Sequence, residues 1–172
     1  MEFFEVLHTR HSIRAFTSQP IAAEHQRAIL DAANRAPSAG NLQAYEIVAV
    51  ANRAVLRDLA SAARAQDFIA QAPLALVFCA HAARSATRYR ERGESLYCLQ
   101  DATIACAYAQ LAATALGLAS VWVGAFDEAA VRQALGADAA RRPIAILPIG
   151  YADEEPRIRS RRKAEELVRW VA

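Results

Sequence analysis

Residues 94–116, with the sequence ESLYCLQDATIACAYAQLAATAL, predict a long helix around which the rest of the fold is organised. At about 1.5 Å per residue this helix is about 33 Å long, close to the width of a whole domain of this size. Four polar side chains, Gln100, Thr103, Gln110 and Thr114, fall within one arc of the helical wheel, and small or apolar side chains cover most of the rest. We therefore expect the helix to be buried on nearly all sides.

The alanine-rich surface of this helix also bears on the oligomeric state. A single domain has limited material to cover such a helix, so we expect it to pack closely against a second copy of the chain in a homodimer. The alternative is a central core helix of a monomer.

Residues 102–126 carry no charge and are long enough to span a membrane. Gln110 and Thr114 interrupt the middle of this segment, and Gly117 would end a helix there. Residues 119–124 then change to a composition typical of a strand. We therefore expect no membrane span.

The composition fits one domain, residues 1–172, in a protein that does not act on nucleic acid. The chain has 20 Lys and Arg against 18 Asp and Glu, a net charge of +2, and its aromatic residues are not interleaved with basic ones. Cys79, Cys98 and Cys106 lie in apolar runs without metal-ligand spacing, which predicts buried, reduced thiols. We therefore expect no metal site. The first residues lack the features of a secretory signal, so we expect a cytoplasmic protein.

Helical and strand patterns alternate along the chain. A short opening helix is followed by predicted helices at residues 22–35, 54–64 and 128–135 and predicted strands at residues 45–50, 74–79, 121–124 and 144–149. The pattern indicates one layered domain of the α/β or α+β class.

Residues 10–14, Arg10-His11-Ser12-Ile13-Arg14, place two guanidinium groups and a hydroxyl at alternate positions. In an extended backbone successive side chains point to opposite faces, so Arg10, Ser12 and Arg14 would project together. Guanidinium groups match the geometry of phosphate and stay charged at any working pH. The motif predicts a site for a phosphorylated ligand, and the alternative is a solvated basic turn.

Residues 36–43, APSAGNLQ, form a polar loop between a predicted helix and an apolar strand. Ser38, Asn41 and Gln43 can both donate and accept hydrogen bonds, which suits the carbonyl and imide edge of a heterocycle. Loops placed on rigid elements often carry function. The alternative is that proline, glycine and asparagine serve only to turn the backbone here.

Taken together, several motifs resemble those of the FMN-dependent nitroreductase family. They are RHSIRAF at residues 10–16, APSAGNLQ at residues 36–43, Gly117-Leu118 followed by Trp122-Val123-Gly124, and the tail Arg159-Ser160-Arg161. The resemblance runs over the whole chain in the same order. It implies an α+β, layered nitroreductase-like fold, in which helices flank a central mixed or antiparallel sheet and the long helix forms a dimer.

The resemblance also implies which residues hold the phosphate of FMN. By position, Arg10 and Ser12 would contact it, with His11 contributing its main chain or ring. Arg159 and Arg161 match two basic positions near the end of the family's chain and would complete the phosphate clamp.

The remaining implied site residues surround the flavin ring. Arg14 would reach the pyrimidine edge. The partner subunit would supply four loop residues, Pro37, Ser38, Ala39 and Asn41, so that each site is shared across the dimer. The backbone at Gly124 and Ala125 would approach flavin N5 and O4.

The chemistry that the resemblance implies is that of an FMN-dependent NAD(P)H oxidoreductase. NADH or NADPH would deliver hydride to flavin N5, and a small-molecule acceptor, a nitroaromatic or quinone, would then take the electrons in a ping-pong cycle. No catalytic side chain is required, although Arg14 would stabilise developing negative charge. The alternatives are a flavin-binding or sensing module without turnover, and a dehalogenase-like or flavin-destructase-like member of the same fold.

The chain departs from the family pattern in three places. Ala44-Tyr45 follows the polar loop, where proline and then tryptophan or phenylalanine are common, and Lys163 replaces a frequent proline. The segment between His81 and Glu94 is short and basic, where larger relatives carry extra helices over the flavin. The choice of substrate and of NADH or NADPH therefore stays open. The arginines of this segment would meet a 2′-phosphate or an acidic acceptor, or form only an exposed basic loop.

Asp101 interrupts the apolar surface of the long helix. We expect it on a helix face, paired with an arginine such as Arg88 or Arg90, and the alternative is an acid–base group.

Overall fold

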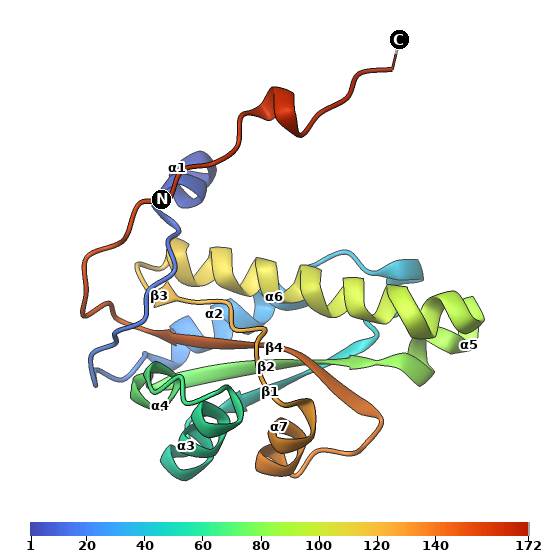
Figure 1. The fold of residues 1–172 in the computed structure, drawn as a ribbon, viewed down its shortest axis with the longest axis horizontal. Coiled ribbons are helices and arrows are strands. Elements are labelled where there is room, and N and C mark those ends of the chain that lie inside the picture. The colour runs from blue at the N-terminus through green and yellow to red at the C-terminus, as the bar shows by residue number, and fades with distance from the viewer. Residues whose placement is uncertain (172) are drawn as a thin grey trace.

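The computed structural model describes residues 1–171 (Figure 1). The helices are α1 (Phe3–Thr9), α2 (Ala23–Asn34), α3 (Arg53–Ala62), α4 (Phe68–Gln71), α5 (Ala82–Arg92), α6 (Cys98–Ala115) and α7 (Glu128–Leu135). Short helical segments are η1 (Ala39–Asn41), η2 (Gly93–Tyr97) and η3 (Ala164–Glu166). The strands are β1 (Tyr45–Val50), β2 (Leu74–His81), β3 (Ala119–Ser120) and β4 (Arg141–Gly150). Within residues 1–171 no helix combines the length and the apolar character that crossing a membrane requires.

The four strands form one sheet in the order β1-β2-β4-β3. All neighbouring strands are antiparallel, with Tyr45 opposite Ala80 and Leu74 opposite Ile149. The resemblance implied either a mixed or an antiparallel sheet, and the four strands form an antiparallel sheet. The α+β class is confirmed.

The strand predicted at residues 121–124 is wrong in its position. The ladder of β3 ends at Ser120, and only Val123 then makes an isolated bridge, to Ile146. Because Ser120 lies opposite Ile149, the same register puts Pro148 opposite Val121. Proline has no N–H to donate, so the ladder is interrupted where the sequence still favours a strand.

The core lies on both faces of the sheet because β2 is buried on both sides. Ala75, Val77 and Cys79 pack into one cluster with α3, α4 and α7, and Leu76 and Phe78 pack into another with α2 and α6. This division follows the period of two along a strand. Figure 1 shows α6 on one side of the sheet and α3, α4 and α7 on the other.

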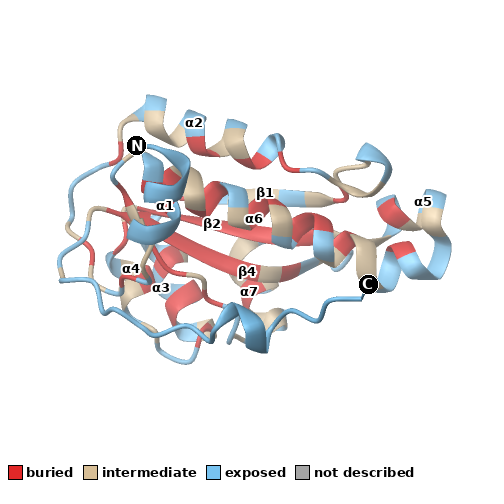
Figure 2. Cartoon of the chain, turned by 90° about the horizontal axis from the view of Figure 1, so that it is seen from above, coloured by how far each residue is buried: buried red, intermediate tan, exposed pale blue. Residues whose placement is uncertain are grey.

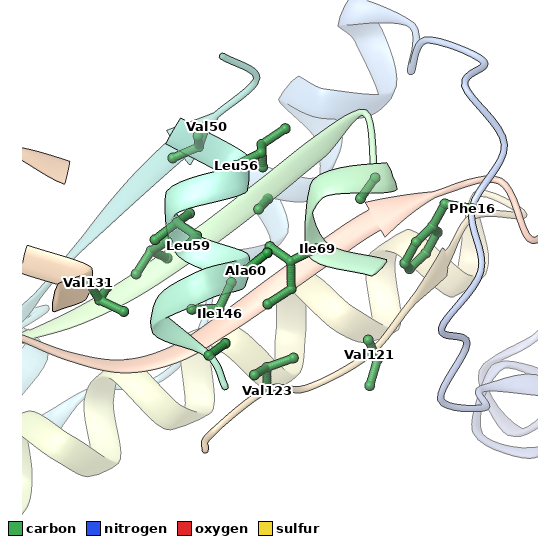
Figure 3. Packing of buried hydrophobic residues seen from close by; sticks show 14 of the residues in the cluster. Phe16, Val50, Leu56, Leu59, Ala60, Ile69, Val121, Val123, Val131 and Ile146 are labelled. Atoms are coloured by element: carbon green, nitrogen blue, oxygen red, sulfur yellow. The ribbon is translucent and has the colours of Figure 1, made fainter. Parts of the chain in front are cut away.

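The first cluster joins elements that are far apart in the sequence. Figure 3 shows Leu56 and Leu59 of α3 and Ile69 of α4 packed near Ile146 of β4 and Val123. Leu56, Leu59 and Ile69 are fully buried. Truncating one of these large side chains to alanine would destabilise the fold by about 2–5 kcal/mol.

Two helices begin where side chains accept hydrogen bonds from the first free N–H groups. Asn52 Oδ1 accepts from Ala54 N at 2.9 Å at the start of α3, and Asp127 Oδ1 accepts from Ala129 N at 2.8 Å at the start of α7. Gly136 ends α7 with a φ of 59°, a left-handed conformation that glycine adopts without steric cost.

The long helix differs from its prediction in its first turn. Residues 93–97 form a π-helical turn, and regular α-helix begins at Cys98. At Gly93 a Cβ atom would lie 2.5 Å from the carbonyl oxygen of Ser85, so the backbones of α5 and η2 are in close contact. Gln110 and Thr114 are buried, whereas Thr103 and Tyr108 are exposed, so one side of α6 is uncovered in the single chain.

The C-terminal segment leaves the body of the protein after β4. From Glu155 to Val171 every residue is exposed, and Trp170 is 90% exposed (Figure 2). Phe4 on α1 is 73% exposed. Figure 1 shows this segment extending outward on the side of α1 and α6. Large apolar side chains at both ends of the chain are therefore left without cover.

Candidate functional site

The basic motif at residues 10–14 lies in extended backbone beside β3. Ile13 N donates to Ser120 O at 3.1 Å, and Asp153 N donates to Ala15 O at 2.9 Å. Ile13 is buried, whereas Ser12 and Arg14 are exposed, as an alternating pattern requires. The backbone pairing therefore fixes which side chains face outward.

These outward side chains meet the C-terminal segment in a cavity of about 260 Å³, which we call the basic pocket. It is lined by Arg10, His11, Ser12, Arg14, Glu154, Arg157, Arg159 and Arg161. Six of the twelve predicted site residues are thus brought together.

The arginines of the basic pocket lack acidic partners within residues 1–171. The ion pairs of this part of the chain are Arg141–Glu46, Arg142–Glu128 and Arg162–Glu166, and all lie outside the pocket. Five guanidinium groups face one carboxylate, that of Glu154, which accepts a hydrogen bond from the backbone N–H of Arg14. The excess positive charge and the Ser12 hydroxyl suit an oxyanion such as phosphate.

Sequence reasoning missed Glu154 and Arg157 in this pocket. Arg157 belongs to the basic tail and could have been chosen by its charge alone. Glu154 carries no such signal, because its role depends on the pairing of residues 151–153 with residues 15–17.

The loop at residues 37–43 is held in an unusual conformation. Gly40, Asn41 and Gln43 have φ values of 57°, 56° and 47°. Within the loop Ser38 Oγ accepts a hydrogen bond from Gln43 N at 3.0 Å. Left-handed backbone at two non-glycine residues is costly, so contacts from outside the loop must support it.

Asp101 supplies this support, and its predicted pairing with Arg88 or Arg90 is wrong. Asp101 is 2% exposed, and its carboxylate accepts hydrogen bonds from Ala39 N at 2.9 Å and from Ala44 N at 3.3 Å. Two backbone N–H groups replace the expected arginine because α6 packs directly under the loop. Burial and then the Asp101 charge raise the pKa of the neighbouring Tyr45.

The same loop borders an open groove of about 540 Å³ along α6, which we call the loop groove. It is lined by Pro37, Ser38, Ala39, Tyr97, Leu99, Gln100, Asp101, Thr103 and Ile104. Most of this lining is apolar, as in sites that take flat ring systems. Asn41 is exposed but does not line the groove.

Gly124 and Ala125 lie in a third place, after the bridge between Val123 and Ile146. The two N–H···O bonds of that bridge are 2.9 Å each, and Gln66 Nε2 donates to Ala125 O at 3.3 Å. Gly124 lines a cavity of about 280 Å³ that Leu99 of α6 also borders. Ten of the twelve predicted site residues therefore line three cavities of the described chain, and Leu99 lies between the loop groove and the cavity at Gly124.

Comparison with known proteins agrees with this fold and these motifs. The model of the Nitroreductase family matches residues 7–66 and 60–151 of the chain. An NADH dehydrogenase of Thermus thermophilus is 31% identical over 188 residues, covering 94% of this chain and 92% of its own.

Two solved structures show the same arrangement. The NADPH:FMN oxidoreductase of Vibrio harveyi, solved with NAD⁺, has a TM-score of 0.89 and 28% identity, and the match covers 98% of this chain and 76% of that one. An FMN-dependent nitroreductase of Clostridium difficile has a TM-score of 0.79 and 28% identity, with 91% of each chain covered. The chain therefore belongs to the nitroreductase family.

Proposed function

We propose that this protein is an FMN-dependent NAD(P)H oxidoreductase whose basic pocket holds the FMN phosphate. The observation that supports this is the concentration of five arginines around one cavity, with Glu154 as the only acid that residues 1–171 contribute to its lining. Each charge-assisted hydrogen bond to a phosphate contributes about 1.5–3 kcal/mol. The residues present fit a dianionic phosphate, which would offset the repulsion among these guanidinium groups.

In this proposal the side chains of the basic pocket contact different parts of FMN. Arg10, Ser12, Arg159 and Arg161 would bind the phosphate, with His11 beside them. Arg14 would lie at the pyrimidine edge, where a fixed positive charge stabilises negative charge on the ring. When bound, FMN supplies the hydride and electron chemistry, and the protein supplies position and exclusion of water.

The active form in this proposal is a homodimer that shares each flavin site. Within one chain the basic pocket shares no lining residue with the loop groove or with the cavity at Gly124, whereas Leu99 lines both of these. A second copy would bring Pro37, Ser38, Ala39 and Asn41 over the flavin and would cover exposed apolar groups such as Phe4 and Trp170.

The proposed substrates are NADH or NADPH as donor and a nitroaromatic or quinone as the small-molecule acceptor, in alternation at one flavin face. The apolar lining of the loop groove supports a flat aromatic acceptor. Cys79, Cys98 and Cys106 are free and buried, and burial raises the pKa of Cys79 to about 11. Unreactive thiols of this kind agree with the expected cytoplasmic location.

The test is the visible spectrum of the purified protein, recorded without oxygen before and after addition of NADH and NADPH. We expect bound flavin that loses its absorbance on addition of one or both donors and regains it with a quinone. Protein that binds no FMN contradicts the proposal. Bound FMN that neither donor reduces would favour a binding or sensing module, and turnover confined to dehalogenation or flavin breakdown would favour the other members of the fold.

A further inference from the structure

Helix α5 carries a cluster of basic residues that the proposed flavin site does not use. Arg84, Arg88, Arg90 and Arg92 are all exposed, and none belongs to an ion pair of the described chain. Figure 2 shows α5 projecting beyond the sheet at one end of α6, with much of its surface exposed. Four unpaired guanidinium groups on one short helix create a local positive field.

Two of these arginines lie against the loop at residues 37–43. Arg84 Nε donates to Leu42 O at 2.6 Å. A Cβ atom on Gly40 would lie 2.8 Å from Arg88 Nη1 and 2.6 Å from Tyr89 Oη, so both side chains are in close contact with the loop backbone. The loop that borders the groove therefore contacts two guanidinium groups of α5.

Two tyrosine rings in edge-to-face contact connect these arginines to the loop groove. The Arg88 guanidinium lies 5.5 Å from the centre of the Tyr89 ring, which meets the Tyr97 ring edge to face at 5.0 Å. Tyr97 lines the loop groove, and its hydroxyl accepts a hydrogen bond from Arg92 Nε at 2.9 Å. Such contacts limit the motion of long side chains, so the positive charge has a defined place beside the groove.

The groove itself has no positive charge to offer a substrate. Its one charged lining residue is Asp101, whose carboxylate is already bonded to Ala39 N and Ala44 N. Selection of a charged substrate must therefore come from the rim. Guanidinium forks bind phosphate and carboxylate with two parallel hydrogen bonds, and Arg84 and Arg88 both retain free N–H groups.

From these contacts we infer that Arg84 and Arg88 form a rim site for an oxyanion carried by the substrate, and so set the substrate preference of the enzyme. The oxyanion is either the 2′-phosphate of NADPH or the carboxylate of an aromatic acceptor. The inference rests on the proposed oxidoreductase function, because it assigns a substrate class to that same site.

Two matched substrate pairs separate these sources. NADPH and NADH differ by the 2′-phosphate, and 4-nitrobenzoate and 4-nitrobenzamide differ by the carboxylate. The kcat/KM of each substrate is measured for the wild type, for Arg84→Gln/Arg88→Gln and for Arg88→Lys. Arg57→Gln is the control, because Arg57 is exposed on α3, on the opposite face of the sheet from α6. Calorimetric titration with NADP⁺, NAD⁺ and the two nitro compounds adds a readout that does not depend on turnover.

In the double variant we expect kcat/KM and affinity for the charged member of one pair to fall by at least about tenfold, the size of one lost charge-assisted contact. The uncharged member should change by less than about twofold. Arg88→Lys should keep only part of the preference, because lysine retains the charge without the guanidinium fork. Arg57→Gln should keep all of it. A change confined to the first pair identifies the 2′-phosphate, and one confined to the second identifies the carboxylate.

The inference is overturned if neither ratio changes, or if both members of a pair fall together. Failure of the proposed function looks different. It would show as wild-type protein without flavin, or as no turnover of either NADH or NADPH with either nitro compound, whereas the calorimetric titrations would still report on the rim site.

Discussion

The basic pocket and the loop groove are built in opposite ways. The walls of the pocket come from the two ends of one chain, joined by hydrogen bonds such as Thr17 N to Tyr151 O at 3.0 Å. Its arginines form no ion pair among residues 1–171. The groove is open and mostly apolar, and its one charged group, Asp101, is satisfied within the protein. The charge of the pocket therefore suits an anion, and the open apolar groove suits a second surface.

This contrast matches the proposal that the cofactor site is divided between two copies of the chain. In the proposed homodimer, the half of the site that would bind the phosphate lies within one chain, so phosphate affinity should depend on that chain's own arginines. The loop that would cover the flavin ring depends on backbone held in a strained conformation, so it should respond to changes in its internal supports. Substitutions in the two regions should therefore separate affinity from loop order.

The largest expected effect comes from removing two arginines of the basic pocket. Arg10→Ala/Arg161→Ala should raise the Kd for FMN by at least about a hundredfold, because two charge-assisted contacts of about 1.5–3 kcal/mol each are lost. Arg10→Ala alone should raise it by at least about tenfold. Quenching of FMN fluorescence on binding measures both values.

Arg162→Ala is the matched control for this pair. Arg162 lies next to Arg161 but bonds to Glu166 at 3.2 Å and does not line the pocket. Its removal should leave the affinity within about twofold, as for most exposed side chains away from a site. Equal losses in the control and in Arg10→Ala would refute the assignment of the pocket.

The next effect concerns the support of the loop groove. Asp101→Ala should lower the free energy of unfolding by about 1–3 kcal/mol, because it leaves the backbone N–H groups of Ala39 and Ala44 without a partner. Denaturant unfolding measures the loss. Amide exchange should accelerate at Ala39 and Ala44 and stay unchanged at Ile13, whose N–H is bonded to Ser120 O.

Thr103→Ala, an exposed substitution on the same helix, should change stability by less than about 0.5 kcal/mol. If Asp101→Ala behaves like Thr103→Ala, the buried carboxylate does not hold the loop.

A smaller effect distinguishes Arg14 from Arg10 within the basic pocket. Arg14→Ala should slow reduction of bound flavin by NADH or NADPH by about tenfold, or about 1.4 kcal/mol, and should weaken FMN binding less than Arg10→Ala does. The backbone N–H of Arg14 still donates to Glu154 in this variant, so the pocket wall is kept. Rapid-mixing absorbance measures the rate, and equal losses of affinity in the two variants would remove the distinction.

The features that depend only on nearby residues in the sequence were predicted correctly. The alternation of Arg10, Ser12 and Arg14 required only an extended backbone, and the helix over residues 98–115 required only its small and apolar side chains. The fit of Gly93 against Ser85, by contrast, depends on the packing of two helical segments, so the π-helical turn was not predicted.

Contacts between distant residues account for the other errors. Asp101 was expected to pair with an arginine because a charge on an apolar helix needs a partner, but the partners are two backbone groups about sixty residues away. Pro148 interrupts the strand after Ser120 only because the register places it there. Neither fact can be derived from a periodic pattern.

The smallest expected effect concerns the ion pair between Arg142 and Glu128, which line the same cavity as Gly124. The hydrogen bond from Arg142 lowers the pKa of Glu128, so its ionised form stabilises the folded state. This contribution is fully present above the ordinary pKa of a glutamate and is lost as the pH falls through the lowered value in the folded protein. Both side chains are well exposed, so Glu128→Gln should lower the free energy of unfolding by less than about 1 kcal/mol at neutral pH.

The unfolding curves of the Glu128→Gln variant and the wild type should converge in acid. FMN affinity should not change, in contrast to the effect of substituting the arginines of the basic pocket. A difference in stability that persists in acid would show that Glu128 acts through packing and not through its charge.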